Sequence, residues 1–169
     1  MKKPNGYIIY EGKSQLNGGN IVAIVTMSSK NIKTGNMASM WILNADIKPT
    51  EASKQGEDAS VCGDCKHRAV NKGACYVTLH HAPLAVYKAY KRGNYPITND
   101  MTIFEGMKVR FGAYGDPSAI PTQILASIKA VVKNNTSYTH QWKQGDKILK
   151  QVSMASVDSI AEQKQAVLE

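Results

Sequence analysis

The sequence lacks an apolar run near the roughly 20 residues that a bilayer-spanning helix needs. Its first residues, Met1 to Gly6, contain no apolar segment of the signal-peptide type. The chain has only three cysteines in 169 residues, and an odd, small number argues against a disulfide framework and for a reducing compartment. These absences predict a cytoplasmic protein with no membrane partner.

The sequence motifs typical of several common enzyme classes are also missing. We find no phosphate-binding P-loop, no G-x-G-x-x-G, no H-E-x-x-H and no G-x-S-x-G. Any chemistry must therefore come from another arrangement of residues.

The composition is typical of a globular protein, with 43% hydrophobic and 20% charged residues. We expect a single domain over residues 1–169, in three parts: a β-meander in 1–48, a cysteine loop in 49–82 and a β/α part in 83–169. Lysine and arginine number 21 against 13 acidic residues, which gives a net charge of +8. A nucleic acid or a nucleotide is therefore a plausible partner, although basic residues spread so evenly fit an ordinary solvated surface equally well.

The first part predicts three consecutive strands joined by tight turns. The strands are expected at residues 6–12, 21–27 and 40–43, with glycine-containing turns at 17–20 and 33–36. The β-branched run at 21–27 predicts a strand that is buried on both faces. Consecutive strands with short connections favour an antiparallel unit.

The last part alternates strands with helices. Strands are expected at 108–114, 137–139 and 148–154, and helices at 83–92, 120–133 and 157–168. Strand–helix–strand order implies parallel pairing with right-handed crossovers. The predicted fold class is mixed α/β: an antiparallel meander, a cysteine-rich metal loop, then parallel β/α units like part of a barrel.

The three cysteines form the strongest pattern in the chain. Cys62 and Cys65 are spaced C-x2-C, and Cys75 follows. Two thiolates at this spacing reach one metal from a tight turn, and Cys75 supplies a third sulfur from the next element. The segment from Pro49 to Gly73 has few large apolar residues, so it must be held by another interaction or stay mobile. Both features predict a metal centre.

The metal itself is left open between two alternatives. A histidine closes a tetrahedral zinc site, with His67, His80 and His81 all near in sequence, and His80 is preferred because it lies near the start of the following helix. Alternatively, the three thiolates hold an iron–sulfur cluster and leave one iron open for a small ligand. The basic residues Lys66, Arg68 and Lys72 are expected to lower the thiol pKa values.

Polar and aromatic side chains follow the predicted parallel strands. Because the carboxyl ends of such strands meet at one edge, these side chains are expected to form a pocket for a planar, polar substrate. The candidate catalytic residues are Asp116, His140, Gln141 and Asp158, and the candidate cofactor-binding residues are Tyr114, Thr139, Trp142 and Ser156. Simpler interpretations exist: Asp116 before Pro117 is a turn former, and Ser156 or Asp158 is a good helix cap.

The order of these motifs resembles a group of uncharacterised tailed-bacteriophage proteins. The shared series is Lys33-Thr34-Gly35, Cys62-x2-Cys65, Gly73-Ala74-Cys75-Tyr76, Tyr114-Gly115-Asp116-Pro117, Tyr138-Thr139-His140-Gln141-Trp142 and Met154-Ala155-Ser156-Val157-Asp158. More distantly, the cysteine segment followed by β/α units is similar to phage proteins related to radical-SAM-type partial barrels. Such proteins carry C-x3-C-x2-C, whereas this chain has C-x2-C-x9-C. The resemblance implies a host-cell cytoplasmic location but no particular activity.

Two functions from different classes follow. The first is a metal-dependent enzyme whose strand-end residues act on a nucleotide or nucleic-acid base, with the cysteine loop folded over the same edge. The second is a zinc-stapled binding module, in which the metal closes the loop and the protein docks on nucleic acid or inhibits a host protein.

Overall fold

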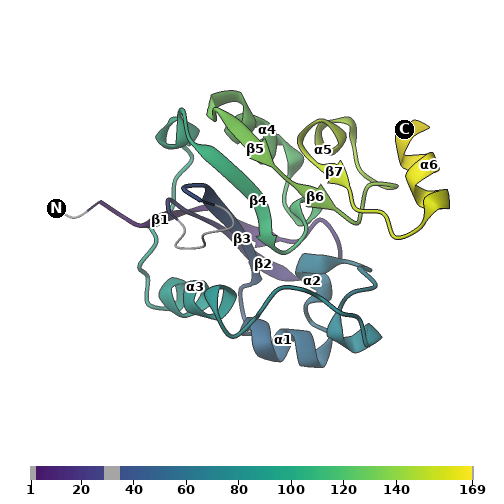
Figure 1. Ribbon diagram of the computed structural model, residues 1–169. Helices are drawn as coiled ribbons and strands as arrows, with labels where there is room; N and C mark the ends of the chain where they lie inside the picture. Colours follow the sequence, from purple (N-terminus) through teal and green to yellow (C-terminus); the bar gives the residue numbers. More distant parts are fainter. Residues whose placement is uncertain (1–2, 29–34, 169) are drawn as a thin grey trace.

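A five-stranded mixed sheet forms the centre of the protein (Figure 1). The structure is a computed structural model and describes residues 3–28 and 35–168. The strands are β1 (Gly6–Lys13), β2 (Asn20–Thr26), β3 (Ala38–Asn44), β4 (Lys108–Tyr114) and β5 (Asn134–Thr136), in that spatial order. β1, β2 and β3 pair antiparallel, whereas β3–β4 and β4–β5 pair parallel. The mixed α/β class, with its antiparallel start and parallel end, is therefore confirmed.

The core lies on both faces of β2 and β3. Every residue of β2 after Asn20 is buried, as the β-branched sequence predicts. Two positions of the predicted turn at 33–36, Lys33 and Thr34, lie outside the described residues. Gly35 and Gly18 take the positive φ values of 55° and 75° that such turns require.

The helices form two groups in Figure 1: α1, α2 and α3 lie below β2 and β3, whereas α4, α5 and α6 lie near β4–β7. The α-helices are α1 (Pro49–Gln55), α2 (Ala59–Cys62), α3 (Ala82–Lys91), α4 (Thr122–Val131), α5 (Lys147–Val152) and α6 (Ile160–Leu168). Short 3-10 turns are η1 (Ala69–Asn71), η2 (Met101–Phe104) and η3 (Pro117–Ala119). No helix in the described ranges is long and apolar enough to cross a membrane.

The strand expected at residues 148–154 is wrong. Residues Lys147–Val152 form α5, and only Met154–Ala155 is extended, as β7. The reason is the residue before the run: Asp146 accepts a hydrogen bond from the Leu149 backbone at 2.7 Å, which begins a helix rather than a strand. Leu149 and Val152 then lie buried one turn apart.

The parallel strands of the last third are divided between two sheets. β6 (Tyr138–Thr139) pairs with β7 in parallel as a separate two-stranded sheet, while the unpredicted strand β5 extends the main one. No closed barrel results among the described strands. The crossover from β6 through α5 to β7 still brings both strand ends to the same edge, next to the cysteine segment (Figure 1).

We predict that Asp146→Ala lowers the free energy of unfolding by about 1 kcal/mol, the typical value of an N-cap side chain. Hydrogen bonds from the Thr122 side chain and the Leu149 backbone hold the pKa of Asp146 below its ordinary value of 3.8. A lowered folded-state pKa stabilises the fold above pH 3.8 and loses that effect as the pH falls through the folded value. Denaturant unfolding of both proteins checks this: the difference should be full at pH 7 and shrink below about pH 4. An equal difference at every pH contradicts the capping role.

Candidate metal centre

All three cysteines line one pocket of about 350 Å³. Cys62 is the last residue of α2, Cys65 lies in the turn that follows, and Cys75 comes from the segment after η1. His67 and His80 also line this pocket. The structure thus places the predicted metal ligands Cys62, Cys65, Cys75 and His80 around a common cavity.

The hydroxyl of Tyr114 has no hydrogen-bond partner although it is buried. It is the one such side-chain atom among the described residues; Tyr114 is 4% exposed and lines the cysteine pocket. An unsatisfied buried hydroxyl costs about 1–3 kcal/mol. Burial raises the pKa of Tyr114 well above its usual value, so the group has a proton to donate. A ligand in the pocket would supply the missing acceptor.

The sulfur atoms are spread more widely than a preformed zinc site requires. Zinc–sulfur bonds of about 2.3 Å in a tetrahedron place two sulfurs ~3.8 Å apart. Among the described His, Cys, Asp and Glu residues, only His67, His140 and Asp158 bring three ligand atoms within 4.8 Å of one another. The three cysteines therefore share a pocket without forming a compact mononuclear site, and thiolates bound to separate iron atoms need less compact spacing.

An ion pair inside the cysteine segment holds the loop without any metal. Arg68 Nη2 lies 2.7 Å from Asp58 Oδ1, and the side chains are only 11% and 4% exposed. The same guanidinium donates to the carbonyls of Gly56 and Gly63. Gly56 adopts φ +82° and Gly63 φ +60°, conformations that favour glycine. The segment expected to need an external staple is thus organised by Arg68 and by the helices on either side.

The expectation that basic neighbours lower the thiol pKa values is wrong for two of the cysteines. Burial raises the pKa of Cys62 well above its usual value, and Asp58 adds to the effect. Burial also raises the pKa of Cys65. Arg68 does not offset this increase in the thiol pKa values, because its positive charge is paired with the Asp58 carboxylate. At neutral pH these two groups are thiols that must lose protons when a metal binds.

The strand-end residue Asp116 is a buried structural link. Its Oδ1 accepts hydrogen bonds from Ser118 and from the Thr139 hydroxyl at 2.7 Å, and its Oδ2 accepts from the His140 backbone at 2.8 Å. Its own backbone N–H donates to the carbonyl of Val61, one residue before Cys62. Both carboxylate oxygens are therefore occupied by the protein, as the turn-former interpretation of Asp116 anticipates.

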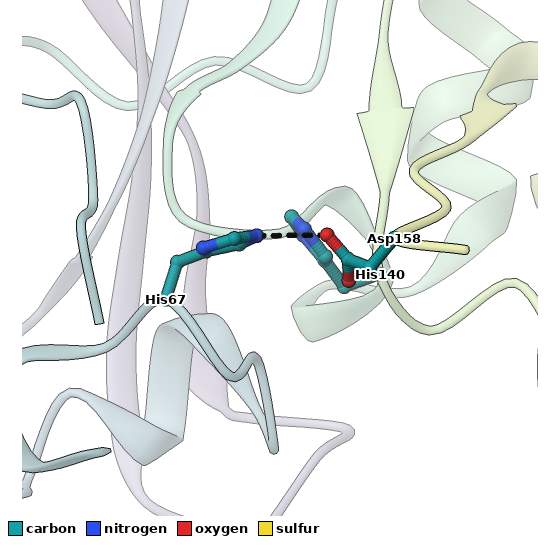
Figure 2. Close-up of side chains that lie close together, drawn as sticks. All are labelled: His67, His140 and Asp158. Carbon is teal, nitrogen blue, oxygen red and sulfur yellow. Dashed lines mark hydrogen bonds and ion pairs between the residues drawn. The ribbon is translucent and has the colours of Figure 1, made fainter. Parts of the chain in front are cut away.

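His140 and Asp158 come together, and a residue of the cysteine loop joins them (Figure 2). His67 Nε2 lies 3.0 Å from Asp158 Oδ1, and the rings of His67 and His140 have centroids 5.5 Å apart. Ser156 lies 3.1 Å from His140 Nε2. The cysteine loop thus contacts the strand ends through His67.

The remaining strand-end residues divide between two places. Gln141 donates to Asp64 of the cysteine loop at 2.6 Å, and a side chain at Gly63 would meet the Gln141 amide at 2.7 Å. Thr139 and Trp142 line a different pocket, of about 460 Å³, beside α6. Tyr114 faces the cysteines rather than the other candidates. The predicted residues thus do not surround a single substrate pocket.

The sequence carries no signal for the partnership of His67 with Asp158, which are separated by 91 positions. His67 was expected only as an alternative zinc ligand near Cys65. The structural role of Arg68 and the unpartnered hydroxyl of Tyr114 were also not predicted. No periodicity or spacing connects such distant residues, so only the fold could reveal these contacts.

Comparison with known proteins adds no further information. No family model, curated protein or solved structure matches the chain. The resemblance to bacteriophage proteins therefore stays a prediction.

We predict that Arg68→Ala lowers the free energy of unfolding by about 3–5 kcal/mol, because it leaves the buried Asp58 carboxylate without its partner. Arg92→Ala, at an exposed position after α3, is the matched control and should change stability by less than about 0.5 kcal/mol. Chemical denaturation of metal-free proteins measures both. Equal losses in the two variants would mean that Arg68 does not hold the loop.

Proposed function

We propose that this protein carries an iron–sulfur centre on Cys62, Cys65 and Cys75, and that the centre serves an enzyme reaction. The observation that carries the proposal is the convergence of the three thiols on one pocket whose wall includes the unpartnered Tyr114 hydroxyl. The pocket fits such a group because its donors are soft sulfur atoms, which favour iron–sulfur clusters.

The contacts of Arg68 with the cysteine loop favour a metal centre that takes part in a reaction over one that only stabilises the fold. Arg68 already holds the loop, so the cysteines are not needed to give the segment a shape. When bound, a cluster with only three protein thiolates would supply an iron that accepts a small ligand or transfers electrons. The protein's part is to hold the cluster through the thiolates and to donate the Tyr114 hydroxyl hydrogen toward it.

Purification without oxygen, followed by iron, sulfide and zinc analysis and a visible spectrum, tests the proposal. We expect iron with labile sulfide and broad visible absorption, and a loss of both in Cys62→Ser, Cys65→Ser and Cys75→Ser. Ala74→Ser is the control because it changes a neighbouring exposed residue and should retain the wild-type content. Unchanged iron and sulfide in the three serine variants would contradict the proposal.

A second candidate is a zinc-stapled binding module that docks on nucleic acid or a host protein. Its support is His80, which lines the same pocket and would be the fourth ligand of a three-cysteine, one-histidine zinc site. His80→Ala distinguishes the two candidates. It should leave iron and sulfide unchanged if the centre is a cluster, whereas it should lower zinc content and melting temperature if zinc is the metal.

We further propose that the substrate is a nucleotide or a nucleic-acid base. The supporting observations are the net charge of +8 and two lysines near the centre: Lys54 lines the cysteine pocket and Lys66 follows Cys65. Cations placed beside a reactive centre attract an anionic substrate and raise its association rate.

Titration of a labelled single-stranded oligonucleotide at several salt concentrations tests this charge-based proposal. We expect the logarithm of the binding constant to fall linearly with the logarithm of salt concentration. Lys54→Gln and Lys66→Gln should each weaken binding and reduce the slope by about 1. Lys88→Gln, on α3 and outside the pocket lining, is the control. Affinity that does not respond to salt or to either variant would rule out this surface as the contact.

A further inference from the structure

We infer that His67, His140 and Asp158 form a second metal site, for a divalent transition-metal ion such as Zn²⁺ or Co²⁺. The inference is independent of the cysteine centre, since it uses different ligands. One ligand atom from each residue lies within 4.8 Å of the other two (Figure 2). Two imidazoles and one carboxylate are a donor set typical of catalytic zinc and non-haem iron sites.

The ligand atoms lie slightly closer together than they would around an ion. His67 Nε2 and Asp158 Oδ1 are 3.0 Å apart, whereas two ligands at about 2.0–2.1 Å from a tetrahedral zinc lie ~3.4 Å apart. A small outward movement of the His67 ring, whose side chain is 39% exposed, would make room. The ion would take the place of the proton now shared by the two groups. A simple His67–Asp158 ion pair accounts for two of the three groups and assigns no role to the His140 ring that lies beside them.

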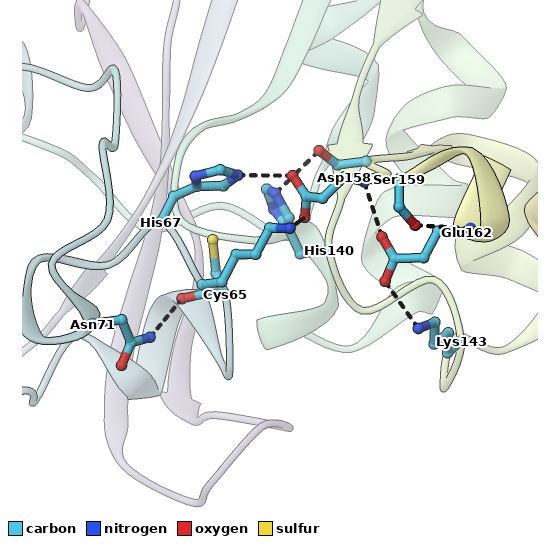
Figure 3. Close-up of polar contacts among 10 residues, drawn as sticks. Cys65, His67, Asn71, His140, Lys143, Asp158, Ser159 and Glu162 are labelled. Atoms are coloured by element: carbon cyan, nitrogen blue, oxygen red, sulfur yellow. Dashed lines mark hydrogen bonds and ion pairs between the residues drawn. The ribbon is translucent and has the colours of Figure 1, made fainter.

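The outer contacts are those that orient metal ligands. Ser156 contacts His140 Nε2 at 3.1 Å, and Asp116 accepts from the His140 backbone. On the other side, Glu162 accepts from the Asp158 backbone at 2.9 Å and is itself paired with Lys143 (Figure 3). The Ser156 contact fixes the direction of the His140 ring, and the two backbone contacts hold the chain at His140 and Asp158 in place.

Lys66 opposes the binding of an ion. Its Nζ lies 3.0 Å from Asp158 Oδ2, so it occupies one carboxylate oxygen and leaves Oδ1 to His67. The half-exposed position of the site leaves room on the solvent side for water or a substrate atom. We therefore expect a site with open coordination positions, of the catalytic type.

Titration of the intact, reduced chain with Co²⁺ tests the inference and separates the two sites. Cobalt bound by thiolates gives charge-transfer absorption in the near ultraviolet, whereas cobalt bound by imidazole and carboxylate gives only visible bands. We expect His140→Ala and Asp158→Asn to remove one equivalent of cobalt and its visible bands. Cys75→Ser should leave that equivalent and those bands in place.

Three further variants sharpen the result. Ser156→Ala should weaken cobalt binding about 10-fold through loss of ring orientation, and Lys66→Met should strengthen it by removing the competing cation. His81→Ala, at an exposed histidine outside the cluster, is the control. If His140→Ala and Asp158→Asn bind as much cobalt as the wild type, with the same affinity, the second site does not exist. If only the thiolate absorption is missing, the second site stands, and the cysteine centre is judged by its iron and sulfide content.

Discussion

The arrangement of the candidate site depends on the buried carboxylate of Asp116. This side chain accepts hydrogen bonds from Thr139 and from the His140 backbone at the end of β6, while its backbone N–H reaches the carbonyl of Val61 in α2. One residue at the end of β4 therefore joins the small β6–β7 sheet to the helix that carries Cys62. Since buried polar groups are stabilising only when they are fully paired, this link fixes the cysteine segment and the strand ends relative to each other.

The link through Asp116 lies between two sets of chemically reactive side chains. The thiols lie on one side, in a pocket whose wall has an unpartnered tyrosine hydroxyl, and the histidine–aspartate cluster lies on the other. His67 belongs to both, because it lines the cysteine pocket and contacts Asp158. If both proposed centres are present, a substrate bound between them would exchange electrons with the iron–sulfur centre. A metal ion at the imidazole–carboxylate site would polarise a bond of the same substrate.

Local patterns predicted the strands β1 to β4, the helices α3, α4 and α6, and the parallel pairing; in β2 and α4 the buried positions follow the sequence pattern. They failed at α5, where one capping contact from Asp146 decides between helix and strand, and at β5, a polar segment whose pairing is set by its neighbour β4. The cysteine spacing predicted that the three thiols reach one metal, and the structure places all three in the lining of one pocket. The contacts of Arg68, His67 and Tyr114 could not be predicted from the sequence, because each depends on where the fold places residues that are distant along the chain.

X-ray absorption at the metal edge, on protein isolated without oxygen, tests the central claim most directly. The account predicts iron surrounded by sulfur, with iron–iron scattering from a cluster on the three cysteines. A metal surrounded only by nitrogen and oxygen would contradict a cysteine-bound centre, and isolated iron or zinc without metal–metal scattering would contradict the cluster.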